Sequence, residues 1–176
     1  MTTLRPMRAD DADAVALLHA TSWRSAYRGM LTDDFLDNHV AADRQAVWRK
    51  RLLSPAPAPA FGFVVEDSAS QLIGFTYVLL QNDPVWGTLV DNLHVHPDRK
   101  GGGIGRRLLQ AAARELGPHH TQPLFLWVLD GNEPAKRFYA RMGADFAEHG
   151  MTDGLGGAQL KEWRCVWRDP QALLHA

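Results

Sequence analysis

The residues best suited to chemistry form a basic, glycine-rich turn near the middle of the chain. Arg99-Lys100 leads into Gly101-Gly102-Gly103-Ile104-Gly105, and Arg106-Arg107 follows. Consecutive glycines let the backbone approach a ligand without Cβ clashes, and free amides at a helix start favour a pyrophosphate. The sequence therefore predicts a phosphate-binding turn. The alternative is an ordinary glycine-rich turn with solvated basic side chains.

Two other kinds of phosphate site do not fit this turn. A Walker loop closes on Gly-Lys-Ser/Thr, whereas here Arg106 and Arg107 follow Gly105. A dinucleotide fold places its glycine loop after the first strand of a parallel βαβ unit, whereas this turn follows segments patterned as a hairpin.

Histidines suggest a metal site, which we reject. His94 and His96 are two residues apart, and His119-His120 lies downstream. The cysteine or acidic partners that zinc requires do not stand at zinc spacing. No metal is therefore expected.

The elements that must position these residues alternate between strands and helices. Strands are predicted over residues 3–8, 61–66, 72–80, 88–96, 124–129, 144–148 and 160–167. Helices are predicted from Asp10-Asp11 to about residue 26 and over residues 41–53, 104–116 and 134–142. Residues 54–59, in which every second residue is proline, predict a stiff connection between layers. The order of elements predicts a mixed α/β sheet.

Length and composition narrow the class of protein. The chain has 176 residues, which fits one domain spanning residues 1–176. Its formal net charge of -1 gives no signature of nucleic-acid or membrane binding. Cys165 is the only cysteine, so no intrachain disulfide is possible and a reducing cytoplasm is the expected location.

The turn and its flanks resemble the GNAT acetyltransferase superfamily. The hallmark of that family is Arg/Gln-x-x-Gly-x-Gly/Ala between its fourth strand and third helix, and residues 100–105 match it with lysine at the first position. Lys100 cannot supply arginine's planar fork, but the backbone cradle is unaffected. A second signature of the family matches downstream at Asn132, Ala135, Phe138, Tyr139 and Gly143.

This resemblance covers residues 88–144 closely and the rest of the chain through the order of elements. It implies an α/β GNAT fold with a mixed, mostly antiparallel twisted sheet of about seven strands and about four flanking helices. The sheet is expected to splay between strands 4 and 5.

The resemblance also implies acetyl-CoA as co-substrate. Its pantetheine arm would lie beside strand four like an extra strand and pair with the backbone of Leu93 and Val95, and the Val95 N–H would polarise the thioester carbonyl. The residues expected to bind the cofactor are Leu93, Val95, Lys100, Gly101, Gly102, Gly103, Ile104, Gly105, Arg106, Asn132, Ala135 and Tyr139.

Amide formation from a thioester needs a neutral amine and a protonated leaving thiolate. Free thiols titrate near about 8.5, so the departing thiolate benefits from a hydroxyl donor. The resemblance assigns that role to Tyr139, with packing against the sheet as the alternative. Asn132 also has the residue type of a helix cap, and the two roles are compatible.

The general base has two candidates on strand four. An alkyl ammonium has a pKa of about 10.4, so a base or a water chain must remove its proton. Asp91, acting through water, is the first candidate because family members often use an acid there, and His94 is the second. Either residue could instead be a buried hydrogen-bonding group. Strand alternation places Asp91 with Leu93 and Val95 on one face, and His94 on the other with Asn92 and His96.

The acceptor site is expected under the first two helices. Residues 22–30 resemble a run found in one bacterial branch of the family, and Trp23, Tyr27 and Trp48 could wall a site for an amine. Core packing is the alternative, and we expect it for at least one of the three. A glycine-rich loop over residues 153–157 could form the opposite wall.

The function expected from the resemblance is acetyl transfer to a primary amine of a small molecule within one ternary complex. The alternatives are a protein N-terminal or lysine acetyltransferase and a non-catalytic acyl-CoA sensor. A homodimer through the C-terminal strands, which carry Trp163 and Trp167, is a further expectation.

Overall fold

The description of the fold rests on a computed structural model of residues 1–54, 59–153 and 159–176. Most of the predicted proline-rich connection (residues 54–59) and of the predicted glycine-rich loop (residues 153–157) lies outside these residues. Within them, no helix has both the length and the apolar composition needed to cross a membrane.

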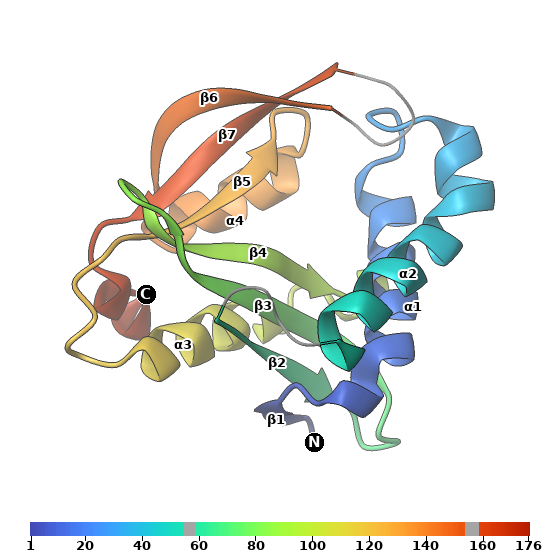
Figure 1. The fold of residues 1–176 in the computed structure, drawn as a ribbon, viewed down its shortest axis with the longest axis horizontal. Coiled ribbons are helices and arrows are strands. Elements are labelled where there is room, and N and C mark those ends of the chain that lie inside the picture. Colours follow the sequence, from blue (N-terminus) through green and yellow to red (C-terminus); the bar gives the residue numbers. More distant parts are fainter. Residues whose placement is uncertain (55–58, 154–158) are drawn as a thin grey trace.

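Within the described residues, seven strands form one sheet. They are β1 (Thr3–Pro6), β2 (Ala60–Glu66), β3 (Leu72–Asp83), β4 (Gly87–Val95), β5 (Leu124–Leu129), β6 (Asp145–Asp153) and β7 (Gln159–Trp167). Their order across the sheet is β1-β2-β3-β4-β5-β7-β6 (Figure 1). Neighbours run antiparallel, apart from the parallel pair β4 and β5.

The sheet splays between β4 and β5, as predicted. Only Thr88↔Leu124 and Leu89↔Phe125 are in register between these strands, and residues 90–95 of β4 continue without β5 beside them. The amide of His96 donates to the carbonyl of Ile73 on the β3 side at 2.9 Å. Since backbone groups alternate along a strand, the amides of Leu93 and Val95 point away from β3 into the splay.

Two pairs of helices cover the sheet (Figure 1). Helices α1 (Ala12–Ala26) and α2 (Val40–Leu53) pack on one face, and α3 (Ile104–Leu116) and α4 (Glu133–Arg141) on the other. Shorter helical turns lie over Ala9–Asp11, Phe35–His39, Pro97–Arg99 and Pro170–His175.

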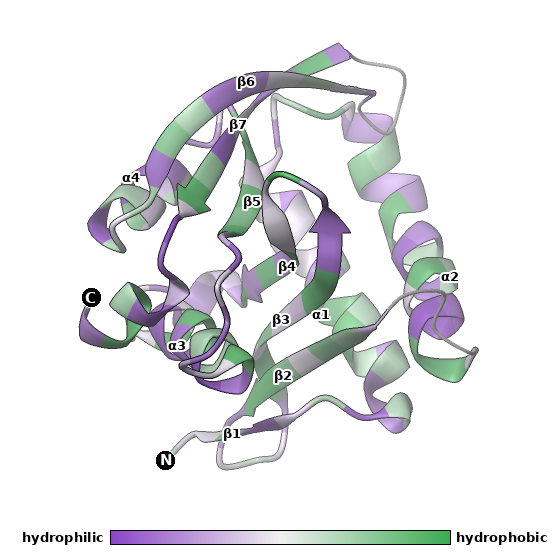
Figure 2. Cartoon of the chain, turned by 60° about the vertical axis from the view of Figure 1, so that its left-hand side comes forward, coloured by the Kyte–Doolittle hydropathy of each residue, from purple (hydrophilic) through white to green (hydrophobic). Residues whose placement is uncertain are grey.

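The core fills both faces of the sheet. Trp48 of α2, with 0% of its surface exposed, packs edge-on against Phe75 of β3 at 5.2 Å between ring centroids. On the other face Leu108 and Leu109 of α3 are fully buried. Figure 2 shows hydrophobic residues along β2, β3 and β5, with hydrophilic residues on α2 and β6. Burying such apolar surface is the main driving force for this layered arrangement.

Strand β4 contains a bulge at Asp91. Tyr77 of β3 pairs with Asn92, whereas its neighbour Val78 pairs with Val90. Asp91 is therefore an extra residue, and a bulge interrupts the alternation of side chains between faces.

The bulge corrects one prediction about faces. Asp91 turns toward α2, where its carboxylate lies 2.6 Å from the Arg51 guanidinium. Leu93 and Val95 pack instead with apolar residues of α3. The prediction that Asp91 shares a face with Leu93 and Val95 is therefore wrong.

Some boundaries also differ from those predicted. Strand β6 extends to Asp153 instead of residue 148, and β3 extends to Asp83 instead of residue 80. Both extensions carry polar residues of low strand propensity. They are strand because β6 pairs with β7 and β3 pairs with β4 there. The turn over Phe35–His39 had no sequence signal, although α2 itself begins within one residue of its predicted start.

The two C-terminal tryptophans are bonded within the chain. The indole N–H of Trp163 donates to Asp130 at 2.9 Å, and that of Trp167 donates to the Met142 carbonyl at 2.8 Å. The homodimer stays a prediction.

Candidate active site

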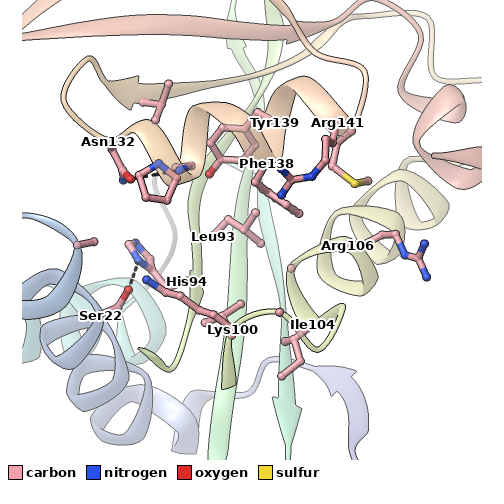
Figure 3. A pocket seen from close by; sticks show the side chains of 18 of the residues that line it. Ser22, Leu93, His94, Lys100, Ile104, Arg106, Asn132, Phe138, Tyr139 and Arg141 are labelled. Atoms are coloured by element: carbon pink, nitrogen blue, oxygen red, sulfur yellow. Dashed lines mark hydrogen bonds between the residues drawn. The ribbon is translucent and has the colours of Figure 1, made fainter. Parts of the chain in front are cut away.

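A cavity of about 830 Å³ opens where β4 and β5 separate. Figure 3 shows His94 and Tyr139 reaching into it from opposite sides, with Leu93 between them. Of the residues predicted from sequence, those that line the cavity are Tyr27, Leu93, His94, Val95, Lys100, Gly101, Gly102, Gly103, Ile104, Gly105, Arg106, Asn132, Ala135 and Tyr139. Asp91 and Trp23 are not among the lining residues.

The glycine-rich turn leaves a row of amides without backbone partners. Gly101 and Gly103 have φ of 81° and 75°, the left-handed region that favours glycine. In the described part of the chain, the first amide after Lys100 that donates to a backbone carbonyl is that of Arg107, at 3.0 Å from Gly103. The amides of residues 101–106 are thus available to a ligand at the start of α3.

Positive side chains surround these amides. Arg99, Lys100, Arg106 and Arg141 all line the cavity. Arg107 instead donates to the Thr2 hydroxyl at 2.6 Å. Free amides, a helix N-terminus and several cations fit a pyrophosphate group.

Gly105 brings α3 against α4. A Cβ at this position would lie 3.1 Å from Cζ of Phe138, which is closer than ordinary contact. The glycine therefore sets the spacing of the two helices. Tyr139 follows Phe138 directly on α4, so this spacing also positions Tyr139.

Tyr139 is almost fully buried, with 8% of its surface exposed. Its ring packs edge-on against Trp167 at 6.1 Å, so the packing role that was the alternative is present. Burial, with smaller contributions from Tyr27 and Cys165, raises the pKa of the Tyr139 hydroxyl above its ordinary value. The hydroxyl therefore stays protonated at physiological pH and can donate its proton into the cavity.

Asn132 caps α4 and also lines the cavity. Its side-chain oxygen accepts the amide of Ala135 at 3.3 Å. The predicted cap is therefore present, and it fixes the first turn of the helix that carries Tyr139.

His94 is held by a serine from α1. Its Nδ1 lies 3.0 Å from the hydroxyl oxygen of Ser22, and its ring stacks on His19 with centroids 4.3 Å apart. Burial, followed by the charges of Arg44 and Lys100, lowers the pKa of His94 to about 3. The imidazole is neutral at physiological pH.

Sequence reasoning missed this arrangement around His94. His19 is 1% exposed and accepts the indole N–H of Trp48 at 2.9 Å. In the sequence, Ser22 stands out only as the start of the run over residues 22–30. The available signal was a serine and a histidine on the buried side of the first helix, because buried polar groups require partners.

The other predicted acceptor residues have different surroundings. Tyr27 lines the cavity, and burial raises its pKa to about 12. Trp23 lies under the Arg44 guanidinium at 4.3 Å, and its indole nitrogen is buried without a partner in the described residues. Trp48 is core, as expected for at least one of the three.

The segment after α1 crosses to the opposite side of the splay. A Cβ on Gly131, in the turn between β5 and α4, would lie 2.8 Å from the sulfur of Met30. Met30 therefore rests on that turn, next to Asn132, although Met30 itself is not among the residues that line the cavity.

The histidines do not gather as a metal site. In residues 1–54, 59–153 and 159–176, no three His, Cys, Asp or Glu side chains come together in a metal-binding group. His96 accepts the amide of Asp98 at 3.3 Å, and His120 lies 3.5 Å from the Thr88 hydroxyl.

A splayed parallel strand pair beside a basic, amide-rich helix start defines a class of protein: acyltransferases that take their acyl group from a coenzyme A thioester. The chain belongs to the Acetyltransferase (GNAT) family, whose sequence model matches residues 18–144. It is an N-acetyltransferase with acetyl-CoA as co-substrate.

Individual relatives agree with this assignment. YuaI of Bacillus subtilis, an uncharacterized N-acetyltransferase, is 26% identical over 98% of this chain and 96% of its own. A mycothiol acetyltransferase of Propionibacterium freudenreichii is 32% identical over 77% of this chain, which spans 40% of that protein. The fold matches a PaiA N-acetyltransferase from Thermoplasma acidophilum solved with coenzyme A, with a TM-score of 0.68 and 18% identity over 92% and 98% of the two chains.

Proposed function

We propose that this enzyme acetylates a primary amine of a small molecule by direct attack on bound acetyl-CoA. The observation that carries the proposal is the placement of His94 and Tyr139 on opposite sides of a cavity whose other end is the phosphate-binding turn. One residue can accept a proton from the incoming amine, and the other can give one to the departing thiolate.

The backbone of β4 positions the thioester in this proposal. The amides of Leu93 and Val95 face the splay, where β5 leaves them without strand partners. The pantetheine arm pairs with this edge, and the Val95 N–H donates to the thioester carbonyl as negative charge develops on its oxygen. The amides of residues 101–106 hold the pyrophosphate.

The two proton steps use different side chains. His94, whose neutral ring is oriented by Ser22, accepts a hydrogen bond from the amine and passes its proton on to water, because a group with a pKa near 3 does not retain a proton at neutral pH. Tyr139 protonates the coenzyme A sulfur as the carbon–sulfur bond breaks and regains its proton from water, which has received the proton of the amine. Asp91 is a weaker candidate base, because Arg51 binds it outside the cavity.

A small acceptor is favoured over a protein by the contact between Met30 and Gly131 and by the named relatives. Met30 rests on Gly131 and bridges the two sides of the splay near Asn132, whereas a polypeptide acceptor needs an open groove. Relatives named for acetylation of mycothiol also have a small-molecule acceptor, although this chain spans only 40% of one such protein.

Calorimetry with acetyl-CoA, followed by thiol release against a panel of amines and peptides, tests the proposal. Saturable binding with release that depends on small amines is the expected result. Faster release with peptides would favour the protein acetyltransferase, and binding without release from any acceptor would favour the sensor.

A further inference from the structure

Glu162 lies on the face of the sheet opposite α4, next to the cavity-lining residue Trp127, although Glu162 itself is not among the lining residues. On β7 it pairs with Leu129 of β5 and Gly150 of β6. A Cβ on Gly150 would lie 2.8 Å from the Trp127 ring and 3.3 Å from Cγ of Glu162. Glu162 and Trp127 therefore share one face of the sheet, and Trp127 lines the cavity.

Glu162 also lies within electrostatic range of α1. After burial, the charge of Glu162 contributes to the raised pKa of Tyr27, against the opposing effect of Arg44. Burial raises the pKa of Glu162 itself, and Arg164 partly offsets that increase. Glu162 is therefore a neighbour of Trp127 in the sheet and near enough to Tyr27 for its charge to act there. Both aromatic residues line the cavity.

The other charged side chains on this face are paired with one another. Arg51 binds Asp91, Arg44 binds Asp43, and Arg164 binds Glu148 at 2.8 Å and Asp83 at 3.5 Å.

Glu162 has no such partner. Within residues 1–54, 59–153 and 159–176 it forms no ion pair. The remaining segments, Pro55-Ala56-Pro57-Ala58 and Gly154-Leu155-Gly156-Gly157-Ala158, contain no charged side chain that could supply one. A half-buried carboxylate without a cation is costly unless a ligand provides one.

We propose that Glu162 binds a second cationic group of the acceptor, so that the substrate is a diamine or another amine with an additional positive charge. The amine that attacks the thioester must be neutral, and an ion pair with Glu162 would keep that amine protonated. Glu162 therefore serves the group that does not react. Trp127 and Tyr27 both line the cavity. The Arg164 guanidinium already lies over the Trp127 ring at 4.4 Å, so Tyr27 is the one of the two rings that we expect to attract a cation on its face. This inference rests on the proposed amine acetylation.

The test compares diaminoalkanes with amino alcohols of the same chain length, in the wild type and in Glu162→Gln. For the wild type we expect the KM of the diamine to be about fivefold to tenfold lower than that of the amino alcohol. In Glu162→Gln that difference disappears, while the KM for acetyl-CoA is unchanged. Asp145→Asn, at an exposed carboxylate on the neighbouring strand β6, is the matched control and retains the wild-type preference.

Calorimetric titration of the same amines into the protein bound to coenzyme A provides a readout that needs no turnover. Tighter binding of diamines that is lost in Glu162→Gln supports the role of Glu162. Equal binding of both amine types by the wild type, equal weakening of both in the variant, or a preference for amines that carry a carboxylate overturns it. If selective binding is found but no amine is acetylated, the proposed function fails while the cation site stands.

Discussion

At the scale of single residues, the proposed proton transfers depend on two side chains whose surroundings suppress their charged forms. Burial keeps the Tyr139 hydroxyl protonated and the His94 imidazole neutral. The site can therefore hold a donor and an acceptor of protons at the same pH. A proton donor and a proton acceptor can work at one pH only when their surroundings keep each in its neutral form.

Replacement of Tyr139 by Phe tests the donor. The substitution keeps the ring that packs on Trp167 and removes only the hydroxyl. We expect kcat to fall by about 100-fold or more, as is common for loss of a general acid, with the calorimetric Kd for acetyl-CoA unchanged. Full kcat in the variant across the pH range would show that another group protonates the thiolate.

The lowered pKa of His94 also affects stability. In the unfolded chain a histidine titrates near about 6.5, whereas in the folded protein His94 titrates near 3. Between these values the unfolded state binds more protons, so the free energy of unfolding falls as pH falls, by at most about 1.4 kcal/mol per pH unit for this histidine. We expect His94→Gln to show a shallower loss of Tm than the wild type between pH 6.5 and 4. His175→Gln, at an exposed position, should follow the wild type.

At the scale of elements, the start of α3 is the feature on which we expect cofactor binding to depend. Gly103 precedes the helix with a positive φ, and no atom lies within 4 Å of the position that its Cβ would occupy. A side chain there would strain the backbone and also intrude on the approach of a phosphate to the amides.

Gly103→Ala separates these effects when it is compared with Gly143→Ala. Gly143, after the end of α4, has a similar φ of 79° and the same open surroundings. We expect each variant to lose about 1–2 kcal/mol of unfolding free energy. Only Gly103→Ala should weaken acetyl-CoA binding in calorimetry. Equal affinities in the two variants would mean that the turn does not bind the cofactor.

The elements near this turn were also the most predictable from sequence. The bounds of α3 and β5 match those predicted, because strong apolar periodicity and glycine punctuation mark both ends. The sequence does not indicate the bulge at Asp91, because Asp91 is an extra residue only in the pairing of β4 with β3. The Ser22–His94 contact joins residues 72 positions apart, and one-dimensional patterns do not show which helix covers a given strand. Likewise, Glu162 looked like an ordinary polar residue of a strand.

At the scale of the whole molecule, charge is distributed unevenly along the cavity. Arginines and a lysine line the cavity at the glycine-rich turn. In the proposals above, Glu162, which has no ion pair among the described residues, lies toward the acceptor side. This polarity matches an anionic cofactor at one end and a cationic acceptor at the other.

That distribution has a cost in stability. Because burial raises the pKa of Glu162, its charged form destabilises the folded state at pH values above that pKa. Glu162→Gln is therefore expected to unfold at a higher temperature than the wild type at pH 7 to 8, with the difference closing as pH falls and the native carboxyl becomes protonated. A lower Tm in the variant at neutral pH would indicate that Glu162 has a stabilising partner.

The narrow junction between β4 and β5 has a mechanical consequence. Within the described residues, β4 and β5 are in register at two residue pairs only, and side-chain contacts such as the Asp83–Arg164 ion pair at 3.5 Å complete the junction between β1–β4 and β5–β7. Because few backbone hydrogen bonds join the two halves of the sheet, we expect this line to open more readily than the other strand pairs. A ligand that pairs with β4 and contacts α4 links the two sides of this junction. Its binding energy then adds to the resistance of the junction to opening, and amide exchange along β4 and β5 should slow together when the cleft is filled.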